Sequence, residues 1–143
     1  MKRRINKVAV LGSGVMGSRI ACHYANVGLD VLLLDIVPRE INYLEKSKGL
    51  TLEDKSVRNR IVNDELQFAV KSNPSPLYRK ADASKIQTGN LDDDLHLIND
   101  CDWVIEAVIE NLKIKHQVFE NVEKHRKPGS LITSNTSGIP IEM

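Results

Sequence analysis

The stretch that decides the fold is residues 7–35, KVAVLGSGVMGSRIACHYANVGLDVLLLD. It opens with a short apolar run over 7–12 that ends in glycine, which is typical of a buried strand. A helical pattern follows over 15–27, and Gly28 stands where a helix commonly stops. The second apolar run, over 30–35, is again typical of a buried strand. A strand, a helix and a second strand in this order predict two parallel strands joined by a crossover helix.

The rest of the chain continues this alternation of apolar runs and helical patterns. The later elements that we expect are helices over 38–48 and 53–72, a weak strand over 84–89, a short helix over 91–100, a strand over 102–108, a helix over 111–126 and a strand over 131–134. Asp92, Asp93 and Asp94 would lie at the positive end of the short helix. The alternation predicts an α/β fold, a doubly wound parallel sheet with helices on both faces. The region near 38–80 is long for one crossover, so we expect a helical excursion from the sheet rather than a second domain.

The composition is that of a globular domain: 143 residues suit one domain, and the formal net charge is +1. That charge gives no support for a nucleic-acid partner, and no apolar run approaches the roughly 20 residues that span a bilayer. The basic residues at 2–4 lack a following apolar segment, so they do not form a secretory signal. Cys22 and Cys101 have no CxxC or metal-ligand spacing. We therefore expect a cytoplasmic protein with buried free thiols, no metal site and no nucleic-acid or membrane partner.

Three glycines follow the first strand as G-x-G-x-x-G, and each has a separate physical role. Gly12 permits a tight turn, Gly14 lets the backbone approach a pyrophosphate, and Gly17 lets the helix lie close to the strand. Val15 and Met16 open the helix, whose free N–H groups and positive dipole end face the phosphates. The pattern alone is weak evidence, but here it follows a strand and opens a helix, as the dinucleotide-binding loop of a Rossmann-type fold requires.

An acidic residue completes this loop. Asp35 ends the second strand 18 residues after Gly17, close to the roughly 20 expected for the acid that binds the adenosine ribose. A carboxylate there accepts hydrogen bonds from the ribose hydroxyls and repels a 2′-phosphate. Residues 36–38 carry no positive charge, and Arg39 is the nearest cation. The sequence therefore favours NAD over NADP as the cofactor, with FAD as a minor option.

Four segments give the chain a family resemblance. VLGSGVMGSRIA, LLLD, VIEAVIENLKIKHQVF and SNTSGIPI resemble, in order and spacing, the NAD-binding domain of L-3-hydroxyacyl-CoA dehydrogenases. The resemblance covers nearly the whole chain and implies that residues 1–143 form one NAD-binding Rossmann domain. It also implies a parent enzyme that oxidises L-3-hydroxyacyl-CoA to 3-ketoacyl-CoA in fatty acid β-oxidation.

The resemblance assigns roles to residues of the two later loops. It implies that Glu110 and Lys115 contact NAD around its nicotinamide half, and that the backbone of Ala107 lines the same path. Ser137 matches the catalytic serine that holds the 3-hydroxyl group of the substrate near the nicotinamide. Asn135 matches a residue that shapes that turn, and all five belong to the expected cofactor site.

Spacing alone says less about these loops. Without the resemblance, Glu106 would be interpreted as a solvated acid at a strand end, and Glu110 as a first-turn acid favoured by the helix dipole. Lys115 would belong to a solvated helix face. These roles therefore depend on the family motif.

The family motif also includes a base that these residues do not supply. In the family, a histidine paired with a glutamate removes the hydroxyl proton, and it lies on the strand after the S-N-T-S turn, beyond Met143. The four histidines present, His23, His96, His116 and His125, do not match that base. We therefore expect a cofactor domain truncated before its last strand or strands, which binds NAD but turns over nothing alone.

Two alternatives stay open. The chain could be a free-standing module that binds or senses NAD, and the reading frame after residue 143 would distinguish this case. It could also be the cofactor domain of another hydroxyacid dehydrogenase of the same superfamily. For the intact enzyme, the resemblance implies an acyl-CoA substrate, and we expect a homo-oligomer.

Overall fold

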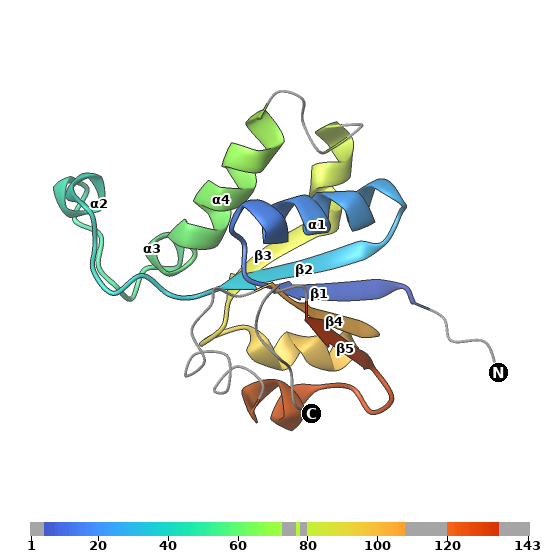
Figure 1. Ribbon diagram of the computed structural model, residues 1–143. Coiled ribbons are helices and arrows are strands. Elements are labelled where there is room, and N and C mark those ends of the chain that lie inside the picture. The colour runs from blue at the N-terminus through green and yellow to red at the C-terminus, as the bar shows by residue number, and fades with distance from the viewer. Residues whose placement is uncertain (1–4, 73–76, 78–79, 108–119, 135–143) are drawn as a thin grey trace.

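The fold is built on a parallel sheet of five strands in the order β3-β2-β1-β4-β5 (Figure 1). The computed structural model describes residues 5–72, 77, 80–107 and 120–134. The strands are β1 Lys7–Leu11, β2 Asp30–Asp35, β3 Ile86–Asn90, β4 Trp103–Glu106 and β5 Leu131–Ser134. The order reverses direction between β1 and β4, which confirms the expected doubly wound α/β fold of Rossmann type.

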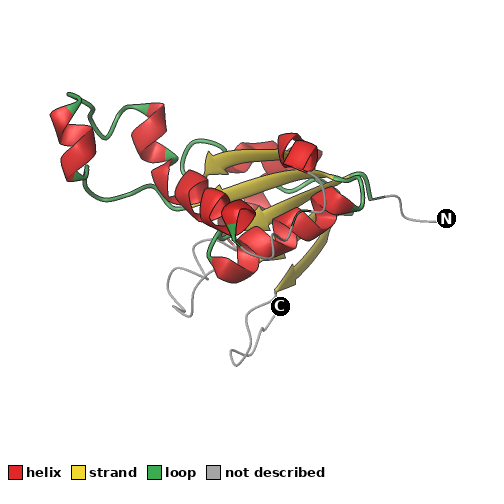
Figure 2. Cartoon of the chain, turned by 90° about the horizontal axis from the view of Figure 1, so that it is seen from above, coloured by secondary structure: helices red, strands yellow, loops and turns green. Residues whose placement is uncertain are grey.

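Helices cover both faces of the sheet (Figures 1 and 2). The helices are α1 Val15–Asn26, α2 Tyr43–Ser47, α3 Lys55–Arg58 and α4 Arg60–Lys71, with 3₁₀ helices η1 Lys80–Lys85 and η2 Leu95–Asp100. Residues 120–125 are also helical. α1, α4 and η1 lie on one face, while η2 and the segment 120–125 lie on the other. No helix in the part of the chain that the structure describes is long and apolar enough to span a bilayer.

The alternation of side chains along β1 and β2 explains why both faces are covered. Val8, Val10, Val31 and Leu33 pack on the α1 face, and their sequence neighbours Ala9, Leu11, Leu32 and Leu34 pack on the η2 face. A strand buried on both faces needs a continuous apolar run, which is what DVLLLD supplies. Each fully buried Val or Leu side chain stabilises the fold by about 1.5–3 kcal/mol.

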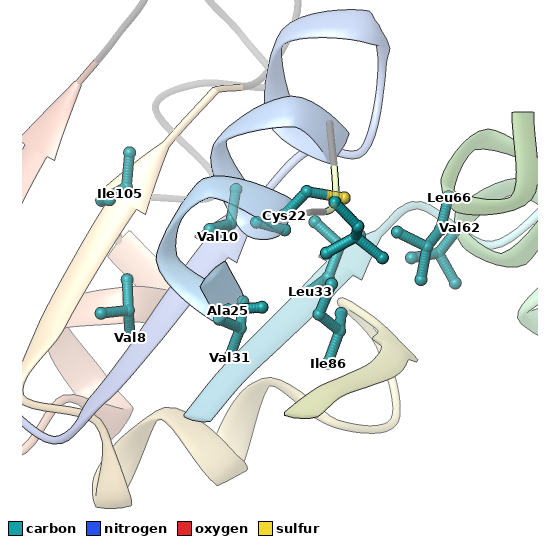
Figure 3. Close-up of a cluster of buried hydrophobic side chains, with 12 residues drawn as sticks. Val8, Val10, Cys22, Ala25, Val31, Leu33, Val62, Leu66, Ile86 and Ile105 are labelled. Atoms are coloured by element: carbon teal, nitrogen blue, oxygen red, sulfur yellow. The ribbon is translucent and has the colours of Figure 1, made fainter. Parts of the chain in front are cut away.

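Small residues bring α1 close to the sheet. Ala21, Cys22 and Ala25 are fully buried between α1 and the strands, and Val62 and Leu66 of α4 close the same cluster (Figure 3). Short side chains shorten the distance between helix and sheet, so the amino end of α1 is held near the end of β1. The position of the glycine loop follows from this packing.

Both cysteines are buried free thiols, as the sequence predicted. Burial raises the pKa of the Cys101 thiol to about 11, and burial also raises the pKa of Cys22. Because the thiolate is the reactive form, both side chains act as small apolar residues at neutral pH.

The excursion between β2 and β3 is helical, but its first helix does not begin near Pro38. α2 begins after Asn42, whose Oδ1 accepts a hydrogen bond from the Glu45 backbone N–H at 2.8 Å, while Glu45 Oε1 accepts from the Asn42 N–H at 2.8 Å. This reciprocal pair satisfies two free donors at the helix start, so it outweighs the preference of proline for a first turn. Glu45 also forms an ion pair with Arg60, which ties α2 to α4. Gly49, with φ of +74°, ends this segment as expected.

The expected helix over 53–72 divides at Asn59 into α3 and α4. Asn59 is buried, and its Oδ1 accepts a hydrogen bond from Asn90 Nδ2 at 2.8 Å. Asp93 takes part in the same contact, since its Oδ2 accepts hydrogen bonds from Asn90 Nδ2 at 3.0 Å and from Arg58 Nε at 2.6 Å. The Arg58 guanidinium holds the pKa of Asp93 below its ordinary value. Asp93 thus makes a tertiary contact, while Asp94 is the N-cap residue of η2, a 3₁₀ helix that covers only 95–100 of the expected 91–100.

An aspartate fixes the amino edge of the sheet. Asp102 precedes β4, and its Oδ2 accepts hydrogen bonds from the backbone N–H groups of Asn6 at 2.9 Å and Lys7 at 3.2 Å. Its Oδ1 accepts from Lys127 Nζ at 2.6 Å. The Lys127 hydrogen bond, followed by the Asn6 N–H, lowers the pKa of Asp102. One carboxylate thus joins the segments that precede β1, β4 and β5.

We expect Asp102→Asn to lower the free energy of unfolding near neutral pH by about 1–2 kcal/mol, because an amide oxygen is a weaker acceptor than a carboxylate. The pKa of Asp102 is lower in the folded protein. Its contribution is therefore present above the unfolded-state pKa of about 3.9 and disappears as the pH falls through the folded-state value. Urea unfolding at about pH 7 and about pH 2.5 should show the wild type and variant converging in acid. Asp64→Asn, at an exposed position of α4, is the control; a gap that persists in acid would contradict the role of the Asp102 charge.

Candidate functional site

The candidate site lies at the carboxyl ends of the central strands, where the sheet order changes direction. Gly12 follows β1, Asp35 ends β2, and Ala107 follows β4. The Gly12 N–H donates to the Leu34 carbonyl at 2.7 Å, and the Ala107 N–H donates to the Leu11 carbonyl at 2.8 Å. The backbone therefore brings three of the predicted site residues to one edge of the sheet.

The three glycines of the loop differ in what limits them. Gly12 has φ of +106°, a conformation that other residues rarely adopt. A Cβ on Gly17 would lie 1.7 Å from the Gly12 carbonyl oxygen, so α1 could not approach β1 with any side chain there. A Cβ on Gly14 would meet no protein atom within 4 Å. Gly12 and Gly17 are thus required by the fold itself, whereas Gly14 keeps an exposed surface free of side chains.

That free surface lies at the start of α1. Gly14 is the N-cap residue of α1 and has no side chain that could hydrogen-bond to the helix start, and Val15 is the first helical residue. The first N–H groups of a helix have no intrahelical acceptors and lie at its positive end, which suits an anion. Met16 is 51% exposed beside them. The loop therefore has the donors and the open approach that a pyrophosphate needs.

The carboxylate of Asp35 is held toward this loop. Its Oδ2 accepts hydrogen bonds from the Ser13 N–H at 2.9 Å and from Ser13 Oγ at 2.5 Å. Its Oδ1 accepts from the Ile36 N–H at 2.7 Å. Asp35 is half-buried, so part of the carboxylate remains accessible to a ligand.

Ser13 is a site residue that sequence reasoning missed. The available signal was a hydroxyl residue between the first two glycines, with an acid at the end of the next strand. A second buried serine, Ser18, donates from its Oγ to the Ser13 carbonyl, and its N–H donates to the Gly14 carbonyl at 2.9 Å. The two serines therefore fix the loop from inside the protein.

Glu106 corrects an expectation. It ends β4 next to Ala107 and is only 1% exposed, so it is not the solvated acid that spacing suggested. Three histidines, His23, His96 and His125, are exposed, in agreement with a surface role. Burial at a strand end is a tertiary property that the local sequence does not reveal.

Several predicted residues lie outside the described part of the chain. They are Glu110, Lys115, Asn135 and Ser137, together with His116. Their roles therefore stay predictions from the resemblance. The described part of the site consists of Gly12, Ser13, Gly14, Val15, Met16, Gly17, Asp35 and Ala107.

Comparisons with known proteins agree with this geometry. The family model "3-hydroxyacyl-CoA dehydrogenase, NAD binding domain" matches residues 7–143. A Bacillus subtilis protein named "Probable 3-hydroxyacyl-CoA dehydrogenase" is 48% identical over 99% of this chain, and a Deinococcus radiodurans protein of the same name is 43% identical over 98%. The crystal structure of (S)-3-hydroxybutyryl-CoA dehydrogenase from Ralstonia eutropha is 25% identical, with a TM-score of 0.60 over 95% of this chain and 42% of that chain. The chain spans 18% and 36% of the length of the two sequence relatives.

Gly14 and Gly17 should respond differently to replacement by alanine. We expect Gly17→Ala to lower the free energy of unfolding by about 1–3 kcal/mol or more, because the added methyl group overlaps the Gly12 carbonyl. Gly14→Ala should cost at most about 1 kcal/mol, the scale of a poorer N-cap. Urea unfolding of both variants measures the difference, and equal losses would contradict the close contact of α1 with the loop.

Proposed function

The chain belongs to the family of NAD-binding domains of 3-hydroxyacyl-CoA dehydrogenases, and from this membership we propose that it binds NAD for the oxidation of L-3-hydroxyacyl-CoA to 3-ketoacyl-CoA. The observation that carries the proposal is the junction of the glycine loop with Asp35, made by two hydrogen bonds from Ser13. One short segment then presents phosphate donors and a ribose acceptor side by side. That pairing is what a dinucleotide with a free 2′-hydroxyl requires.

The pyrophosphate would lie over Gly14, at the start of α1. No protein atom lies within 4 Å of the place where a Cβ of Gly14 would be. The backbone N–H groups could therefore come close to the phosphate oxygens. Val15, Met16 and Gly17 supply N–H groups of the first helical turn. Their contribution is electrostatic and independent of the base, so it fits any dinucleotide.

Asp35 would select among dinucleotides. A carboxylate has about four lone-pair sites, and among the described residues Ser13 and Ile36 occupy three of them. The remaining site on Oδ1 can accept a ribose hydroxyl. A 2′-phosphate would instead bring negative charge against the carboxylate, so NAD is favoured over NADP.

The nicotinamide half would follow the carboxyl end of β4. When bound, NAD accepts the hydride that leaves C3 of the hydroxyacyl chain. The backbone at Ala107 would line the path of this half, and by family resemblance Glu110 and Lys115 would contact it. Ser137 would hold the substrate hydroxyl by a hydrogen bond, in a turn shaped by Asn135. Orientation of the two reactants is the main contribution of these residues.

The same proposal includes the setting of the enzyme. Some relatives are named as fatty acid oxidation complex trifunctional enzymes or β-oxidation multifunctional proteins. We propose an acyl-CoA substrate, a homo-oligomeric parent and a cytoplasmic location. The buried free thiols Cys22 and Cys101 support the last of these, because such thiols suit a reducing compartment.

Binding of NAD can be tested directly. We expect NADH fluorescence to change on titration with this chain, and Asp35→Ala to weaken binding about 10- to 150-fold, the equivalent of about 1.5–3 kcal/mol for hydrogen bonds to a charged group. Asp30→Ala is the matched control, because Asp30 is an exposed acid at the opposite end of the same strand. An Asp35→Ala dissociation constant equal to that of wild type would remove Asp35 from the site. The absence of any change at millimolar NADH would contradict the proposed function.

Catalysis needs an assay on the protein in which this chain occurs. With L-3-hydroxybutyryl-CoA and NAD, we expect NADH to form, as measured by its absorbance. Asp35→Ala should raise KM for NAD and leave KM for the acyl-CoA unchanged, because the carboxylate would touch only the adenosine ribose. NADH binding without turnover of any L-3-hydroxyacyl-CoA would favour a binding module instead of an enzyme.

A further inference from the structure

Ser13 makes an unusual pair of contacts with the acid of the proposed site. Both its backbone N–H and its hydroxyl donate to the same oxygen, Asp35 Oδ2, at 2.9 and 2.5 Å. Ser13 is fully buried, whereas Asp35 is half-buried. The bonds from Ser13 to Oδ2 are partly buried, whereas the bond from the Ile36 N–H to Oδ1 is exposed, so the Oδ1 side of the carboxylate faces solvent.

The position of the Ser13 hydroxyl is itself fixed. The carbonyl of Ser13 accepts a hydrogen bond from Ser18 Oγ on α1, and the N–H of the preceding Gly12 donates to the Leu34 carbonyl at 2.7 Å. These contacts hold Ser13 to both α1 and β2. A buried hydroxyl also needs a partner, and the contact with Asp35 satisfies it.

Without this hydroxyl, the donors to Asp35 in the described part of the chain would be two backbone N–H groups, those of Ser13 and Ile36. A half-exposed aspartate at the end of a strand can then turn about its side-chain torsions and hydrogen-bond to water. Binding of a ribose would have to remove that freedom, which weakens affinity. The Ser13 hydroxyl restricts this freedom of the Asp35 side chain before a ribose binds.

We propose that Ser13 is a positioning residue, which holds the Asp35 carboxylate in the orientation that receives the adenosine ribose of NAD. This inference rests on the proposed function and adds a residue that acts through Asp35. It also has a consequence for specificity. A carboxylate held in place cannot turn away from a 2′-phosphate, so Ser13 strengthens the preference for NAD over NADP.

A double-mutant cycle on NADH binding tests the proposal. In the wild-type background, Ser13→Ala should weaken NADH binding about tenfold, the scale of one hydrogen bond to a charged acceptor. In the Asp35→Ala background, the same substitution should change the dissociation constant less than about twofold, because the group that Ser13 positions is gone. Ser13→Ala should also reduce the ratio of NADPH to NADH dissociation constants, a readout that general loosening of the loop would leave unchanged.

A second cycle needs no cofactor. Urea unfolding of the free wild type, the two single variants and the double variant should show non-additive losses, since either single substitution removes the same hydrogen bond. The control is Ser72→Ala, which removes a half-buried hydroxyl at the carboxyl end of α4 that donates to the Ala69 carbonyl at 2.6 Å, outside the glycine loop. The loss of unfolding free energy that this control causes should add to the loss caused by Asp35→Ala.

The outcomes separate this inference from the proposed function. Coupling of Ser13 and Asp35 in both cycles, with additivity for Ser72, supports the positioning role. Additive unfolding losses for Ser13 and Asp35, or an equal loss of NADH affinity in both backgrounds, would overturn it. If the variants show coupling on unfolding but the wild-type protein binds no NADH, the proposed function is overturned. The ribose is then also excluded as the ligand of this carboxylate.

Discussion

The carbonyl oxygen of Gly12 occupies the place where any side chain of residue 17 would begin. This contact sets the distance between α1 and the end of β1, and the small residues Ala21 and Ala25 keep the rest of the helix equally close. A helix held at this distance directs its first N–H groups to a point just beyond the strand. The geometry proposed for binding a pyrophosphate is therefore a consequence of how the first helix packs on the sheet.

Burial of the sheet on both faces restricts where polar groups can be placed. Within the central strands the buried side chains are apolar, and polar ones appear at the strand ends. Asp35, Asn90 and Glu106 lie at carboxyl ends, whereas Asp102 and its partner Lys127 lie at the amino edge. The carboxyl edge holds the proposed site, and the amino edge holds the contacts that join three strands. The contacts of the amino edge can therefore be changed without altering a residue of the proposed site.

The sequence was informative wherever a local rule coincided with burial. β2 has the predicted bounds, because an apolar run between turn residues can be satisfied only as a buried strand in this context. β5 also has its predicted bounds, although Leu131 is exposed and Ile132 is only half-buried. The region between β2 and β3 was predicted as helical, but its helix bounds depend on Asn42 with Glu45 and on the distant contact of Asn59 with Asn90. Contacts between residues about 30 positions apart leave no periodic signal in the sequence.

The proposed site is divided between two parts of the chain. The parts proposed for phosphate and ribose come from one strand-helix-strand unit, residues 7–35, whose spacing is constrained by backbone hydrogen bonds between β1 and β2. The parts proposed for the nicotinamide come from the other half of the sheet, starting at Ala107. β1 and β4 pair in parallel from Val8 with Trp103 to Leu11 with Glu106, and the backbone bond from the Ala107 N–H to the Leu11 carbonyl continues this pairing at the carboxyl edge. On this proposal, affinity for the adenosine half of NAD would come from the first unit alone, whereas the place of hydride transfer would depend on how β4 and β5 are held against it.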